Sequence, residues 1–106
     1  ESAAAGLPII ATGWSGHLEF LKSGTYLNVE YNMQEIPKEK VDNRIFFEGV
    51  RWADPIKQSY FTRLDDLYYN YDLHKANALE HSTHIKENYS RGKIIDIYEK
   101  CFNEVL

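Results

Sequence analysis

The loop formed by Thr12, Gly13, Trp14, Ser15 and Gly16 is the stretch whose residue types and position could do chemistry. It follows a short apolar run at residues 9–12 and precedes a short helix that we expect at residues 17–21. Loops at the carboxyl ends of parallel strands line the ligand crevice in open α/β sheets, and the N–H groups that start the next helix can meet an anion. The same glycines suit a tight turn that binds nothing. The sequence leaves both interpretations open.

Three histidines form the second group with possible chemistry. His74, His81 and His84 fall on one predicted helix, so a zinc site is conceivable. Zinc sites need three or four converging ligands with supporting second-shell bonds, and neither a nearby cysteine nor a His-Glu-x-x-His motif is present. We therefore expect solvated helix histidines and no metal site. The sequence also contains no Ser/His/Asp triad, Walker loop or Gly-x-Gly-x-x-Gly motif.

The elements around the loop indicate a slice of a parallel sheet. Residues 2–5 are small and helix-compatible, and Gly6 followed by Pro8 marks the end of a helix. Residues 9–12 do not alternate with polar residues, which predicts a strand buried on both faces. Residues 25–31 do alternate, which predicts a half-exposed strand, and the spacing allows a right-handed crossover to a parallel neighbour. The predicted class is α/β, with a partial Rossmann-like sheet.

The rest of the chain predicts an insertion followed by helices. Residues 32–43 have no convincing period and are expected to form a long loop, with a short extra strand at residues 45–47. Asp54 and Pro55 are typical of a helix start, and Ser90 can cap the last helix. We thus expect one partial domain over residues 1–106, divided into a strand segment 1–31, a loop or insertion 32–53 and C-terminal helices 54–106. The apolar face of the first helix is expected at Ile56, Tyr60, Phe61, Leu64, Leu67, Tyr68 and Tyr71, and that of the second at Ala78, Ser82, Ile85 and Tyr89.

Composition excludes several classes of partner. The chain has 106 residues and a formal net charge of -4, without a basic run, so nucleic acid is a poor candidate partner. Its single cysteine, Cys101, predicts a reducing compartment, which we take to be the cytoplasm. No apolar stretch approaches the length of a membrane span.

Because the sequence starts on Glu1 in a helical pattern, we expect it to be a piece of a longer protein.

The first nineteen residues resemble a known family. Glu1, the alanines after it, the run Gly-Leu-Pro-Ile-Ile-Ala-Thr at residues 6–12, Gly16 and Glu19 are similar to the nucleotide-sugar-binding half of the group 1 retaining glycosyltransferases, which have the two-domain GT-B fold. A weaker match is Trp-Ala-Asp-Pro at residues 52–55. Trp14 departs from the family, which usually has a small or acidic residue near this position.

The resemblance implies a function for the parent protein and for one residue of this chain. The parent would transfer a hexose from a UDP- or GDP-linked sugar to a saccharide or lipid-linked acceptor, as in polysaccharide biosynthesis, without a tightly bound cofactor or metal. Glu1 matches the glutamate that accepts hydrogen bonds from the ribose hydroxyls. The other donor-site residues and an N-terminal acceptor domain would precede residue 1, so the fragment alone should be inactive. The parent could associate peripherally with a membrane.

The sequence is also compatible with other functions. The chain could be a non-catalytic GT-B-like binding or assembly module, or part of a nucleotide-sugar epimerase of the same architecture. Trp14 could stack on an acceptor sugar or pack against another domain. The first strand would also lack a neighbour, and an unpaired strand edge favours self-association.

Overall fold

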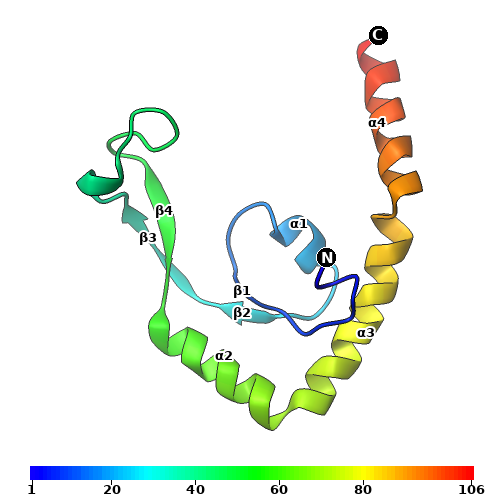
Figure 1. Ribbon diagram of the computed structural model, residues 1–106, viewed down its shortest axis with the longest axis horizontal. Coiled ribbons are helices and arrows are strands. Elements are labelled where there is room, and N and C mark those ends of the chain that lie inside the picture. The colour runs from blue at the N-terminus through cyan, green and yellow to red at the C-terminus, as the bar shows by residue number, and fades with distance from the viewer.

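The computed structural model describes residues 1–106 as a thin, open assembly of short strands and longer helices (Figure 1). Its radius of gyration is 17.6 Å, whereas a compact domain of this length has a value of about 13 Å. Only nine of the 106 residues are buried. The first two strands and the first helix lie in the middle, the other two strands lie on one side, and the last two helices run along the opposite side (Figure 1). The structure is therefore a mixed α/β domain with a small core.

The predicted helix end at Gly6 is confirmed as a single helical turn. The Ala5 amide donates to the Glu1 carbonyl at 3.0 Å, and the Leu7 amide donates to the Ser2 carbonyl at 3.1 Å. Gly6 has a φ of 76°, and its own amide donates to the Ala3 carbonyl. These bonds make a Schellman motif, in which a left-handed residue ends the helical turn. Glycine fits this position because it has no Cβ to clash there.

The parallel strand pair is also confirmed. Strand β1 (Ile10–Thr12), helix α1 (Leu18–Leu21) and strand β2 (Leu27–Val29) follow one another, and β1 pairs with β2 in parallel. Leu27, Val29 and Leu21 are buried, while β1 is only half-buried. The expectation that β1 is buried on both faces is therefore wrong. Its outer edge has no hydrogen-bonded neighbour in the two-stranded sheet.

The region predicted as a long loop contains an antiparallel hairpin. Strand β3 (Tyr31–Glu35) pairs with strand β4 (Arg51–Pro55), and a 3-10 turn η1 (Lys38–Lys40) lies between them. Residues 43–46 form bends, and the predicted strand at residues 45–47 is absent. Trp52 packs edge-on against Phe46 with ring centroids 5.6 Å apart. This aromatic pair joins the connecting loop to β4.

Asp42 organises that connecting loop. Its Oδ1 accepts hydrogen bonds from the backbone amides of Arg44, Ile45 and Phe46 at 2.9 to 3.0 Å. The bonds from Arg44, Phe46 and Ile45 favour the charged carboxylate and lower the pKa of Asp42 below its usual value of 3.8. Because the pKa is lower in the native state, the ionised carboxylate stabilises the loop at pH values above the usual pKa of 3.8. This stabilisation is lost as the pH falls through the native pKa.

We expect a carboxyl-detected NMR titration to give Asp42 a midpoint below 3.8. The amide shifts of Arg44, Ile45 and Phe46 should titrate with the same midpoint, because these amides donate to the carboxylate. Asp42→Asn is the control, since it keeps an acceptor oxygen but removes the titrating group, and these amide shifts should then lose that transition. A midpoint at or above 3.8 would show that the three bonds do not form in solution.

Three helices follow the hairpin: α2 (Lys57–Tyr69), α3 (Tyr71–Asn88) and α4 (Arg91–Val105). The predicted start at Asp54 and Pro55 is wrong, because both residues belong to the β3–β4 ladder and Ile56 precedes the first helical residue. The predicted cap at Ser90 is confirmed, since its Oγ accepts from the Lys93 amide. None of these helices is both long enough and apolar enough to cross a membrane.

Helices α2 and α3 differ in how well their predicted faces match the structure. On α2, polar side chains contact the sheet: Ser59 Oγ accepts from the Glu30 amide at 2.9 Å, and Arg63 Nε donates to the Asn28 carbonyl at 2.7 Å. The predicted apolar face of α2 is wrong for its exposed members, which are Tyr60, Phe61, Leu64, Tyr68 and Tyr71. On α3 the prediction is confirmed, with Ala78 and Ser82 buried and Ile85 and Tyr89 half-buried.

Candidate functional site

The loop at residues 12–16 lies at the carboxyl end of β1, where the sequence places it. The Thr12 carbonyl accepts two hydrogen bonds, one from the Trp14 amide at 2.8 Å and one from His17 Nε2 at 2.6 Å. The His17 imidazole must donate through Nε2 to make this bond, so the contact selects the tautomer protonated there. The loop is thus closed by its own hydrogen bonds and has a defined shape.

The two loop glycines have different roles. The Gly13 amide donates to the Val29 carbonyl at 3.1 Å, and a Cβ on Gly13 would collide with the Asn28 side chain. A side chain at Gly13 would therefore have to displace the amide group of Asn28. A Cβ on Gly16 would meet open space, so no neighbouring atom excludes a side chain at that position. The positive φ in this loop belongs to Ser15, at 87°.

Three successive free amides of this region lie in the loop before helix α1. The amides of Leu18 and Glu19 donate to the carbonyls of Ser15 and Gly16 at 3.1 and 3.2 Å. The amides of Ser15, Gly16 and His17 make no hydrogen bond within the chain. Helix α1 has four residues, which is too short for its dipole to matter. Any anion contact would thus come from the three successive free amides of the turn, a geometry known to accept anions.

Glu1 lies at a different place, beside the first helical turn and the end of α3. It borders a hollow of about 290 Å³ whose other walls are mostly apolar. Phe20 and Tyr89 supply aromatic rings there, and the remaining lining residues are Ala3, Ala4 and Ile85. An exposed carboxylate at the rim of an aromatic hollow can accept hydrogen bonds from hydroxyls while the rings bury an apolar part of the same ligand.

The structure does not bring the two predicted groups into one cavity. None of residues 12–16 lines the hollow beside Glu1. Trp14 is 38% exposed, so its indole is accessible from solvent as the stacking interpretation requires. Glu19 contributes through its backbone, because its carbonyl accepts from the Tyr89 hydroxyl at 3.2 Å, while its carboxylate is exposed and 3.9 Å from Lys22 Nζ. The hollow and the loop are two separate candidate surfaces.

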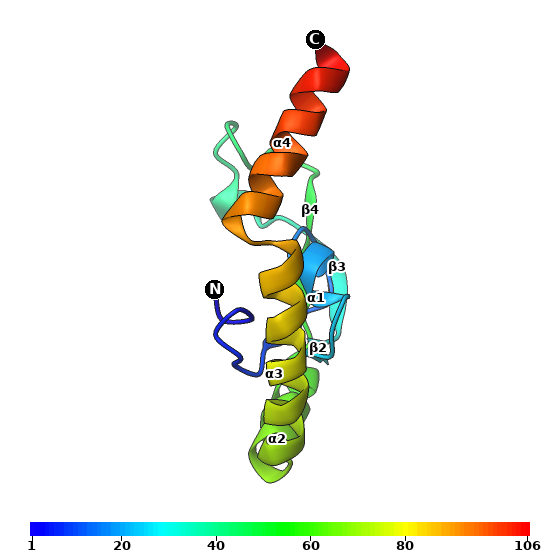
Figure 2. The same ribbon diagram turned by 90° about the vertical axis from the view of Figure 1, so that its right-hand side faces the viewer.

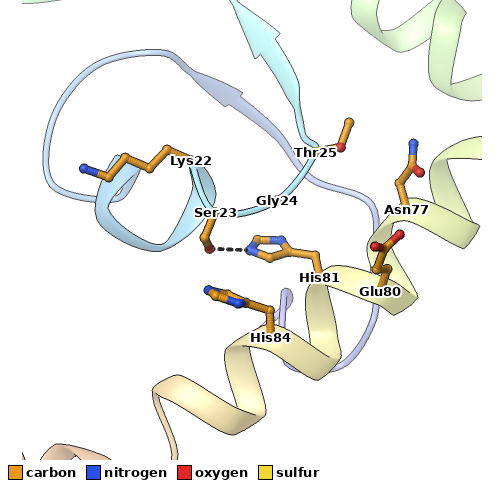
Figure 3. Close-up of a pocket in the computed structure, with 8 residues that line it drawn as sticks. All are labelled: Lys22, Ser23, Gly24, Thr25, Asn77, Glu80, His81 and His84. Carbon is orange, nitrogen blue, oxygen red and sulfur yellow. Dashed lines mark hydrogen bonds between the residues drawn. The ribbon is translucent and has the colours of Figure 1, made fainter.

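A second cavity, of about 440 Å³, has entirely polar walls and was not expected from the sequence (Figure 3). It lies between the turn after α1 and one side of α3. Its lining residues are Lys22, Ser23, Gly24, Thr25, Asn77, Glu80, His81 and His84. Figure 3 shows His81 reaching from α3 toward Ser23 with His84 below it. The two imidazoles stack with centroids 6.4 Å apart.

His81 is buried, so its interpretation as a solvated helix histidine is wrong. It is 5% exposed, and its Nε2 lies 2.8 Å from the Phe20 carbonyl and 3.4 Å from Ser23 Oγ. Its ring packs directly on Gly24, where a Cβ would collide with the imidazole. The Ser-Gly pair before the second strand is the only sequence signal for this contact. His81 is therefore a packing residue that joins α3 to the α1 turn.

The other histidines do not form a metal site. His74 Nε2 is buried and lies 3.2 Å from Asp66 Oδ1 on α2. The contacts from His74 and from the Asn70 amide group lower the pKa of Asp66. His84 contacts Asn88 one turn along α3. No group of three or more His, Cys, Asp or Glu side chains comes together in a way that could hold a metal ion.

Comparisons of the chain with protein-family models, with curated proteins and with solved structures found no match. The class that the fold defines is therefore a small α/β domain with a two-stranded parallel sheet, a hairpin and three C-terminal helices. Any function must be argued from the residues of the loop and of the two cavities.

We expect Gly24→Ala to lower the free energy of unfolding by about 1 to 3 kcal/mol, because the added methyl group overpacks the His81 contact. Gly16→Ala is the matched control, since its Cβ meets no atom and its stability should stay near that of the wild type. Urea unfolding followed by circular dichroism measures both. Equal stability of the two variants would show that His81 does not pack on Gly24.

Proposed function

We propose that this chain is part of the nucleotide-sugar-binding domain of a retaining glycosyltransferase. The single observation that carries the proposal is the order of elements along residues 1–19: a glycine-ended helical turn, a parallel strand and a loop with free amides. The family pattern that these residues resemble requires this order. The Schellman motif at Gly6 gives a physical reason for one glycine of that pattern.

In this proposal Glu1 binds the ribose of the donor. Its carboxylate is acceptor-only when ionised and suits two neighbouring hydroxyl groups. The adjoining hollow offers the rings of Phe20 and Tyr89 for contact with the apolar faces of a nucleoside. The free amides at residues 15–17 suit a phosphate or a donor hydroxyl, and the accessible Trp14 suits stacking on an acceptor sugar.

The reaction itself would need groups that this chain does not supply. Transfer with a nucleoside diphosphate as leaving group needs stabilisation of the developing negative charge and exclusion of water from the donor. We assign those tasks to the remainder of the parent enzyme, including its acceptor domain. The 106-residue chain alone is accordingly proposed to be inactive.

Calorimetry on the full-length polypeptide that contains this chain tests the proposal. UDP or GDP should bind, and Glu1→Gln should weaken that binding about tenfold or more, because hydrogen bonds from the ribose hydroxyls to a charged acceptor are lost. Glu48→Gln is the matched control, since Glu48 is an exposed glutamate in the β3–β4 connection. It should bind like the wild type.

Two outcomes would contradict the proposal in different ways. Binding of neither nucleotide would reject a donor site and favour a module with an assembly role. Binding that Glu1→Gln leaves unchanged would reject the role of Glu1. Nucleotide binding without transfer of sugar from any UDP- or GDP-linked donor would favour the non-catalytic module or an epimerase.

A further inference from the structure

The polar cavity between the turn after α1 and helix α3 has no part in the proposed function. Figures 1 and 2 show α1 beside α3, and the hydrogen bond from His81 to the Phe20 carbonyl joins them. The cavity has a volume of about 440 Å³, and small-molecule sites typically measure about 300 to 1,000 Å³. No apolar side chain lines it. An occupant would therefore be recognised through hydrogen bonds and charge alone.

His81 offers a lone pair to this cavity. The Phe20 carbonyl can only accept, so His81 Nε2, at 2.8 Å, carries the hydrogen and Nδ1 is left as an acceptor. Nδ1 makes no hydrogen bond within the chain. The one fully buried side-chain nitrogen or oxygen without a hydrogen bond is His74 Nε2, so Nδ1 of His81 is reached from the cavity that His81 lines. The side chain is held firmly, because His81 is only 5% exposed.

His84 offers a hydrogen to the same cavity. Asn88 Nδ2 donates to the His84 carbonyl at 2.9 Å, which fixes the orientation of the Asn88 amide group because its oxygen could not make this bond. The same Nδ2 lies 3.3 Å from His84 Nδ1, so Nδ1 accepts and Nε2 carries the hydrogen. Nε2 of His84 makes no hydrogen bond within the chain. The two stacked imidazoles therefore provide one acceptor and one donor.

The remaining walls repeat this balance of donors and acceptors. Glu80 only accepts when ionised and Lys22 only donates, so their formal charges cancel. The Lys22 ammonium remains available, because its distance of 3.9 Å from Glu19 is longer than a hydrogen bond. Asn77 and Thr25 can each donate and accept. Such walls suit a neutral group that donates and accepts at once, which is the property of a hydroxyl group.

We propose that this cavity binds a small neutral polyol of the size of a monosaccharide. Its hydroxyl groups donate to His81 Nδ1 and accept from His84 Nε2. The expected dissociation constant is about 1 mM or higher, because hydrogen bonds exchanged with water contribute little each and no apolar surface is buried. The proposal does not rest on the proposed function, since no residue that lines this cavity is assigned to the donor site.

Saturation-transfer NMR on the full-length polypeptide tests the binding with myo-inositol, a neutral ring with a hydroxyl group on every carbon. Inositol should receive saturation with a dissociation constant in the millimolar range. Fully O-methylated inositol, which accepts but cannot donate, should not bind, because His81 Nδ1 and Glu80 need a donor. Methylammonium, which donates but cannot accept, should not displace inositol.

Substitutions in the walls locate the binding. His84→Phe keeps an aromatic ring but removes the N–H donor, and Thr25→Val keeps the branched shape but removes the hydroxyl group. Each should raise the dissociation constant for inositol about fivefold. Thr83→Val is the matched control, since Thr83 is exposed and does not line the cavity, and it should bind like the wild type. Circular dichroism should show the same helix content in all three variants.

A spectroscopic measurement replaces substitution of His81, because that side chain joins α3 to the turn after α1. Imidazole ¹⁵N shifts in the same polypeptide should show that Nε2 carries the hydrogen in His81 and in His84. Addition of inositol should move the Nδ1 resonance of His81, because that atom then accepts a hydrogen bond. The resonances of His74 should stay where they are, since His74 does not line the cavity.

Several results would overturn the proposal. No saturation of inositol at any soluble concentration would reject a polyol site. Equal binding of the O-methylated derivative would show that the acceptors of the walls are not used, and displacement by methylammonium would indicate a cation site. Inositol binding that neither His84→Phe nor Thr25→Val weakens would place the polyol elsewhere in the polypeptide, whatever the outcome with UDP or GDP.

Discussion

The structure depends on polar side chains of α3 that donate hydrogen bonds to backbone carbonyls of the N-terminal segment. The carbonyls belong to short helical turns, whose last acceptors have no backbone partner within the turn. With only nine buried residues, apolar packing alone connects α3 weakly to this segment. Leaving a buried acceptor unpaired costs about 1 to 3 kcal/mol, so the bonds to the part-buried carbonyls of Gly6 and Ala4 matter most. The four contacts run from Lys75 to Gly6, Ser82 to Ala4, His81 to Phe20 and Tyr89 to Glu19.

Much of the fold around this interface follows from the sequence, but the interface itself does not. Glycine and proline punctuation and short apolar runs predict the turn at Gly6 and the parallel strands, and the capping ability of serine predicts the cap at Ser90. The hairpin escapes prediction because β3 is polar and largely exposed, so its ladder leaves no apolar alternation. Burial of His81 escapes prediction because its partners are a backbone carbonyl and a glycine, which periodicity does not register.

The candidate site is predictable to a similar extent. Residue types and spacing place the loop 12–16 at the end of a parallel strand, and they single out Glu1. They do not predict the hollow beside Glu1, because Phe20 and Tyr89 come from helices whose approach is set by the hydrogen bonds of α3. Nor do they predict that three successive free amides occur at residues 15–17. Such features depend on tertiary contacts between distant segments.

Native-state hydrogen exchange of the Leu27 amide, which donates to the Ile9 carbonyl at 2.9 Å, tests the role of these hydrogen bonds most directly. The variant is Ser82→Ala, which raises helix propensity while removing the bond to Ala4. Thr83→Ala, at an exposed neighbouring position, is the control. We predict that exchange at Leu27 accelerates about tenfold in Ser82→Ala only. Unchanged protection at Leu27 would show that the strand pair does not depend on α3.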